Sequence, residues 1–118
     1  EISMVSTVGW ELEEDRMVSP GGSKTMEVIK KMEFDHHRMT SGVVVRCQQT
    51  NKLTVYVKGS YERVAVISHA VPADYRERTE KYANSGYYVL GMATKQLPPT
   101  LTQQQLADMT RDSLEADL

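Results

Sequence analysis

The sequence predicts an α+β domain in which helices pack on an antiparallel β-sheet. The main evidence is a hairpin: residues 42–48 and 53–58 both alternate apolar with polar side chains, and a polar turn at 49–52 joins them. The stretches 10–14 and 25–34 also alternate, whereas apolar residues in other stretches recur at helical spacing. The expected strands are 10–14, 25–34, 42–48, 53–58 and 87–94, and the expected helices are 61–69, 72–85 and 102–118. Because consecutive strands usually lie side by side, this order favours an antiparallel sheet.

The alternation also predicts which side chains face the core. In the strand at 53–58, Lys58 points away from the aliphatic face that ends at Val57. In the strand before it, the valines at 43 and 45 share a face with Cys47. In the strand at 25–34, one face is expected to carry four apolar residues, Met26, Val28, Met32 and Phe34.

Local signals predict where the helices begin and end. Ser60 suits the N-cap of the first helix, and Pro72 opens the second. Gly86 supplies a C-terminal stop for the second helix. Thr102 and Gln105 form a capping-box pair at the start of the last helix.

Composition limits the class of protein. The chain has 118 residues, which suits a single domain over 1–118, and its 40% hydrophobic and 25% charged residues are ordinary for a globular domain. A net charge of −2 argues against a nucleic-acid groove or an anionic membrane surface. No apolar run approaches the roughly 20 residues that span a bilayer, and no signal peptide is visible. The single cysteine fits a reducing compartment.

The two ends of the sequence suggest an excised piece. The chain starts without methionine and ends inside a helical pattern, so we expect it to be a fragment of a longer protein. Residues 1–8 fit either a short helix or a frayed terminus.

Two motifs that could carry chemistry are weak. The Ser-Pro-Gly-Gly-Ser run at 19–23 is expected to be a connecting loop, because it lacks the Gly-x-x-x-x-Gly-Lys-Ser/Thr pattern of a phosphate-binding loop. His36 and His37 are adjacent and should point to opposite faces of an extended strand, which disfavours a shared metal. Asp35 beside them could do acid–base work, but no paired nucleophile is visible.

Several motifs in order resemble the nucleotide-binding domain of the P-type ATPases. These are Phe34 with the Arg-Met run at 38–39, the hairpin, the Lys-Gly-Ser run at 58–60 and the Val-Leu-Gly-Met-Ala strand at 89–93. The Thr-Val-Gly-Trp-Glu-Leu-Glu-Glu run at 7–14 is similar to one in the P5B subgroup. The resemblance covers nearly the whole chain.

The resemblance changes how two ordinary residues are interpreted. From the residues alone, Phe34 is either a core side chain or a ligand platform, and Lys58 is most simply a solvated lysine at a strand end. The resemblance implies that Phe34 stacks on adenine, a contact that contributes roughly 1–3 kcal/mol. It implies that Lys58 lies beside the anionic nucleotide and that Gly59 keeps side-chain bulk away from it.

Four further residues enter the expected site through the same resemblance. Arg38 and Met39 match the family's Arg-Met, with Thr40 as an apparent insertion after them. Glu1 matches a glutamate that bonds the adenine edge. Tyr88 stands where the family usually has an arginine that contacts the nucleotide, so a cation is lost there.

The resemblance implies the ATP-binding cytosolic domain of a membrane P-type ATPase that transports polyamines or related cations, at the cytosolic face of an endomembrane. The domain would hold adenine while the γ-phosphate reaches an aspartate in the phosphorylation domain, which would also hold most of the Mg²⁺. Residues 101–118 would lead towards that domain, and the actuator domain would be a second partner in the same chain. The Asp-Lys-Thr-Gly-Thr motif is absent here, so this piece alone should be inactive.

A rival interpretation is a non-catalytic protein-interaction module that binds no nucleotide. It would use the tyrosine-rich helix face with Tyr75 and Tyr82. Adenine nucleotides should perturb residues around Phe34 and Lys58 only under the first interpretation.

Overall fold

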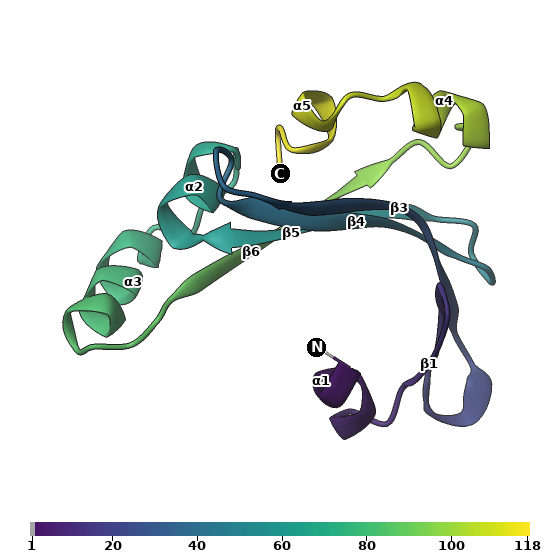
Figure 1. The fold of residues 1–118 in the computed structure, drawn as a ribbon, viewed down its shortest axis with the longest axis horizontal. Coiled ribbons are helices and arrows are strands. Elements are labelled where there is room, and N and C mark those ends of the chain that lie inside the picture. The colour runs from purple at the N-terminus through teal and green to yellow at the C-terminus, as the bar shows by residue number, and fades with distance from the viewer. Residues whose placement is uncertain (1) are drawn as a thin grey trace.

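A computed structural model describes residues 2–118 and shows an antiparallel sheet with helices packed against it (Figure 1). The sheet has six strands in the order β1-β2-β3-β4-β5-β6, so every strand pairs with its neighbour in sequence. The strands are β1 (Glu11–Glu13), β2 (Arg16–Val18), β3 (Thr25–Asp35), β4 (Thr40–Cys47), β5 (Leu53–Ser60) and β6 (Leu90–Leu97). The predicted α+β class and antiparallel sheet are confirmed.

The helices gather in three places around the sheet. Figure 1 shows α4 and α5 over one face, α2 and α3 at one end, and α1 with β1 curled below the opposite face. The helices are α1 (Ile2–Thr7), the 3-10 turn η1 (Pro20–Gly22), α2 (Tyr61–Val66), α3 (Tyr75–Asn84), α4 (Gln103–Asp108) and α5 (Arg111–Leu114). Residues 1–8 fitted a helix or a frayed end, and Ile2–Thr7 of this stretch form the helix α1.

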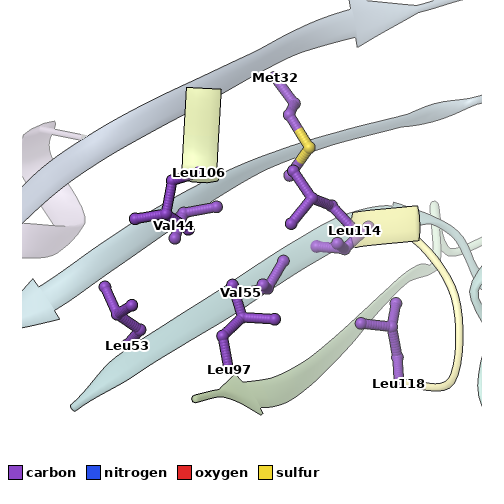
Figure 2. Packing of buried hydrophobic residues seen from close by; sticks show 9 residues of the cluster. Met32, Val44, Leu53, Val55, Leu97, Leu106, Leu114 and Leu118 are labelled. Carbon is purple, nitrogen blue, oxygen red and sulfur yellow. The ribbon is translucent and has the colours of Figure 1, made fainter. Parts of the chain in front are cut away.

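The core lies between the C-terminal helices and one face of the sheet, which we call the helix face. Leu106 of α4 and Leu114 of α5 point down onto the aliphatic side chains of the strands (Figure 2). The cluster consists of Met32, Val44, Leu53, Val55, Val57, Leu97, Leu106, Leu114 and Leu118. The opposite face carries Val43, Tyr56 and Lys58, and we call it the open face. Lys58 therefore lies off the core face, as predicted.

One expectation about strand faces is wrong. Met26, Val28, Met32 and Phe34 do not share a face, because the pairing of β3 with β4 shifts by one residue between Val28 and Lys30. Val28 pairs with Val45 on the open face, whereas Lys30 pairs with Val44 on the helix face. Such a bulge places two residues opposite one and reverses the alternation beyond it. Met32 therefore reaches the core, where it is 5% exposed.

Several element boundaries also differ from the sequence prediction. The strand expected at 87–94 is β6, which begins only at Leu90 because its partner Ser60 is the last residue of β5. The second helix begins at Tyr75, since residues 73 and 74 form a turn after Pro72. The first helix ends at Val66 rather than near residue 69. The strand β2 was not predicted.

The C-terminal helix predicted at 102–118 is two short helices. The capping box of Thr102 and Gln105 is present at the start of α4, as predicted. The helix stops where Met109 adopts extended dihedral angles, φ −66° and ψ 132°. Thr110 then caps α5 by accepting a hydrogen bond from the backbone N–H of Ser113. A threonine that can cap a new helix favours such a break.

Two lysines from the sheet fasten this C-terminal segment. Lys30 Nζ donates to the Met109 carbonyl at 2.8 Å and to the Leu106 carbonyl at 3.3 Å. Lys95 Nζ donates to the carbonyls of Ser113 and Ala116, both at 2.6 Å. A cation at a helix C-terminus satisfies carbonyls that have no partner within the helix. Burial lowers the pKa of Lys95.

Within residues 2–118, no helix is both long enough and apolar enough to cross a membrane.

Candidate functional site

The turn after β3 is organised by Asp35. Its carboxylate accepts hydrogen bonds from the backbone N–H groups of His37 at 2.7 Å and Arg38 at 3.1 Å. The bonds from Arg38 and His37 favour the ionised carboxylate and lower the pKa of Asp35. Met39 closes the turn with a positive φ of 57°, and its N–H donates to the Asp35 carbonyl at 2.7 Å. The turn therefore holds the Arg-Met run directly after Phe34.

A second bulge in β3 brings Phe34 onto the open face. Met32 pairs with Gly42 and Asp35 pairs with Thr40, so Glu33 and Phe34 together lie opposite a single residue of β4. Met32 and Asp35 pair with residues on the helix face, which leaves the two residues between them on the open face. Phe34 is 51% exposed there. It is not a core residue.

Phe34 has one aromatic neighbour. The ring of His36 meets it edge-on, with centroids 5.1 Å apart and an interplanar angle of 90°. The two rings are thus perpendicular to each other, and half of the Phe34 surface stays accessible. An accessible ring with a fixed orientation is the geometry that a planar base needs for stacking.

A hollow of about 440 Å³ lies on the open face. Its lining includes Lys31, Glu33, Ser41, Tyr56, Lys58 and Met92. Ser41, Lys58 and Met92 form one cross-strand row, because Lys58 pairs with both of the others. Lys58 therefore lines the hollow directly, and so does Glu33, the residue before Phe34 in the sequence; Phe34 itself is not among the residues that line it.

Charges within the hollow are mixed. Lys31 forms an ion pair with Asp15 at 2.9 Å, and that contact raises the pKa of Lys31. Glu33 supplies a carboxylate that can accept from an amino group. Lys58 supplies a cation, so the hollow offers both an acceptor and a positive charge to a polar ligand.

Gly59 allows a close approach between two strands. It is buried, and a Cβ atom there would collide with the Met39 carbonyl oxygen and with Thr40. The glycine therefore lets β5 pass close to the start of β4. Because Met39 also accepts a hydrogen bond from the Ser60 N–H at 3.1 Å, Gly59 fixes the turn after Phe34 against the end of β5.

Arg38 points towards α5. Its guanidinium lies 2.6 Å from Asp112 and 3.5 Å from Glu115, and the hydrogen bond with Asp112 raises the pKa of Arg38. The side chain is 27% exposed. Met39, by contrast, is 44% exposed at the tip of the turn. Phe34 and Lys58 thus lie on the open face near the turn. The Arg38 guanidinium instead forms ion pairs with Asp112 and Glu115 on the helix face.

One expected site residue, Tyr88, lies further out. Tyr88 precedes β6 by two residues and is 89% exposed, beyond the last paired row at Leu90 and Ser60. Glu1 lies outside the residues that the structure describes.

The histidines and the tyrosine-rich helix face give little support to other chemistry. No group of three or more His, Cys, Asp or Glu side chains within the described part of the chain is arranged to hold a metal ion. Tyr75 turns inward and donates a hydrogen bond to the Tyr61 carbonyl at 2.7 Å. Tyr82 is 54% exposed and packs edge-on against Tyr87. The two tyrosines expected to form one interaction surface therefore differ: Tyr82 is exposed, whereas Tyr75 points inward.

Sequence reasoning missed the residues that complete the hollow and the turn. Glu33 and Lys31 read as polar positions of an ordinary strand, and nothing in their pattern reveals the bulge. Met92 was part of a family-like strand and had no assigned role. Arg111, which bonds to the backbone around Phe34, lies 78 residues away from Glu33 in the sequence. Its one local signal is the i,i+4 spacing to Glu115.

The chain has several curated relatives, although no family model matches it. An "endoplasmic reticulum transmembrane helix translocase" of Schizosaccharomyces pombe is 31% identical, and the human "polyamine-transporting ATPase 13A2" is 27% identical. The translocase of Saccharomyces cerevisiae is 26% identical. All three alignments cover 100% of this chain, and they cover 10%, 12% and 10% of the relatives respectively.

This chain is homologous to the P5-type ATPases. The resemblance to P-type ATPases inferred from the motifs is thereby confirmed, and the α+β fold agrees with it. The chain spans about a tenth of the length of the curated relatives that it matches. P5-type relatives named for helix translocation and for polyamine transport match at similar identity.

Proposed function

We propose that this chain is the nucleotide-binding domain of a P5-type ATPase, with adenine stacked on Phe34 and the phosphates drawn towards Lys58. The observation that carries the proposal is the second bulge of β3. It places an exposed aromatic ring directly after Glu33, which lines a hollow together with Lys58, on the face that the C-terminal helices leave uncovered.

The hollow suits a ligand of this kind in size and chemistry. Small-molecule sites usually measure about 300–1,000 Å³, and this one is about 440 Å³. Phe34 offers a platform, Glu33 an acceptor for an amino group and Lys58 a positive charge. These three are the complements of a purine ring, an exocyclic amine and a phosphate.

In the whole protein, the domain would present the γ-phosphate of ATP to an aspartate in the phosphorylation domain. Mg²⁺ would be held mainly by that domain, and the actuator domain would complete the cycle. The run at 7–14 favours the P5B subgroup, hence polyamines or related cations as cargo and the cytosolic face of an endomembrane as location. The sequence lacks Asp-Lys-Thr-Gly-Thr, so we expect this domain to bind ATP without hydrolysing it.

A nucleotide titration followed by NMR tests the proposal. With a single platform and with tyrosine at position 88, we expect a dissociation constant on the order of 1 mM, equivalent to about −4 kcal/mol. Backbone signals around Phe34 and Lys58 should move with ATP, while those around Tyr82 should not. Movement confined to the α3 region, or none at ATP concentrations of about 10 mM, would contradict the proposal.

A further inference from the structure

Arg111 of α5 reaches across to the backbone on both sides of the bulge that carries Phe34. One terminal nitrogen donates to the Glu33 carbonyl at 2.7 Å, and the other donates to the Thr40 carbonyl at 2.8 Å. The side chain is only 22% exposed. A single guanidinium therefore bridges β3 immediately before Phe34 and β4 immediately after the turn.

This bridge lies where the hydrogen-bonded pairing of β3 with β4 is interrupted. Regular pairing is interrupted between Met32 and Asp35, and a bulge leaves ladder groups there without their usual partners. Arg111 supplies a donor to the Glu33 carbonyl within that interruption. The orientation of the Phe34 backbone thus depends on a donor from a distant helix.

The guanidinium is itself held in place by Glu115. Arg111 Nε lies 3.3 Å from a Glu115 carboxylate oxygen, and that carboxylate is 3% exposed. Glu115 also accepts a hydrogen bond from the Thr40 hydroxyl at 2.7 Å. The ion pair with Glu115 thus holds the guanidinium beside Thr40, where its terminal nitrogens reach the carbonyls of Glu33 and Thr40.

We propose that Arg111 is a positioning residue for the base site: it sets the orientation of Phe34 through the backbone of the bulge and touches no ligand itself. The proposal rests on the function proposed above only in calling Phe34 a base platform. Arginine suits the task because its planar group donates in two directions at once, whereas lysine offers a point charge.

The test compares Arg111→Met and Arg111→Lys with Lys95→Met. Lys95 is the matched control, because it fastens the same C-terminal segment but donates to the carbonyls of Ser113 and Ala116 instead of those of Glu33 and Thr40. Arg111→Lys keeps the charge beside Glu115, so it should fold even if the methionine variant does not. Thermal unfolding of every variant reports the purely structural effect.

The first measurement needs no nucleotide. Phe34 is the only phenylalanine, so ring-labelled phenylalanine yields signals from this one side chain. We expect those ring signals to move in both Arg111 variants and to stay in place in Lys95→Met. Unchanged signals in Arg111→Lys, or an equal change in Lys95→Met, would overturn the proposal.

The second measurement is the affinity for ATP and adenosine. Each Arg111 variant should weaken both ligands by the same factor, about fivefold, the lower end of what a stacked base contributes. In a Phe34→Ala background the same substitution should cause no additional loss. A loss confined to ATP would mean that Arg111 meets the phosphates and would refute an effect through Phe34. If neither the wild type nor any variant binds nucleotide, the proposed function is wrong. The ring signals of Phe34 would still decide whether Arg111 positions that side chain.

Discussion

Replacing Phe34 by alanine should separate ligand binding from folding. Full burial of a phenylalanine side chain contributes about 1.5–3 kcal/mol, and Phe34 is 51% exposed, so its removal should lower the free energy of unfolding by about 1 kcal/mol. A fully buried phenylalanine would cost about 3–5 kcal/mol. Denaturant unfolding distinguishes these two values.

The effect on affinity should be larger. If adenine stacks on the Phe34 ring, its loss removes about 1–3 kcal/mol of binding free energy, a decrease in affinity of about 5-fold to 150-fold. The factor should be the same for ATP and adenosine, because the lost contact is to the base. NMR titration of both ligands against the wild type and Phe34→Ala measures it.

Tyr82→Ala is the matched control for this substitution. Tyr82 is 54% exposed and packs edge-on against a second ring with centroids 5.8 Å apart, so it resembles Phe34 in exposure and in aromatic support. It lies on α3, away from the hollow. We expect it to leave both affinities unchanged. Equal losses in the two variants, or no loss in Phe34→Ala, would refute the stacking argument.

Four other substitutions test individual charges, at the site and elsewhere in the fold. Lys58→Met should weaken ATP more than adenosine, with a difference that shrinks as salt is added, as titrations at two ionic strengths would show. Tyr88→Arg should strengthen ATP binding by at most about fivefold, because position 88 is 89% exposed and exposed charge pairs contribute about 0.2–1 kcal/mol; a loss of affinity would contradict this. Lys30→Met should lower the free energy of unfolding by about 1.5–3 kcal/mol, measured in urea, since it removes charged hydrogen bonds from the end of α4. Asp35 has a lowered pKa, so its contribution is present above its unfolded pKa of about 3.9 and is lost as the pH falls through the folded value; Asp35→Asn should flatten this acid limb of stability.

Regular parts of the sheet could be predicted from the sequence. Strict alternation in 53–58 placed Val57 in the core and Lys58 on the opposite face, because side chains of an unbroken strand have a period of two. Helix starts at Ser60 and Thr102 followed from side chains that accept hydrogen bonds from their own helix. These features depend on neighbours within a few residues.

The bulges of β3 could not be predicted in this way. Each shifts the pairing by one residue, which reverses the expected face of everything beyond it. Met32 and Phe34 were assigned to the same face, yet one is in the core and the other is half exposed on the open face. The donor that supports the second bulge, Arg111, comes from the far end of the chain. A local pattern carries no information about it.

The Arg-Met run shows why a motif match and a ligand contact are separate statements. In this structure Arg38 contacts Asp112 and the buried Glu115, the same carboxylate that holds Arg111. A phosphate could engage Arg38 only by displacing these acidic partners, and it would approach from the face opposite Lys58. Both arginines therefore bind the turn that follows Phe34 to α5. On this geometry Arg38 helps to hold the turn after Phe34 in place, and the lysines that line the hollow are Lys31 and Lys58.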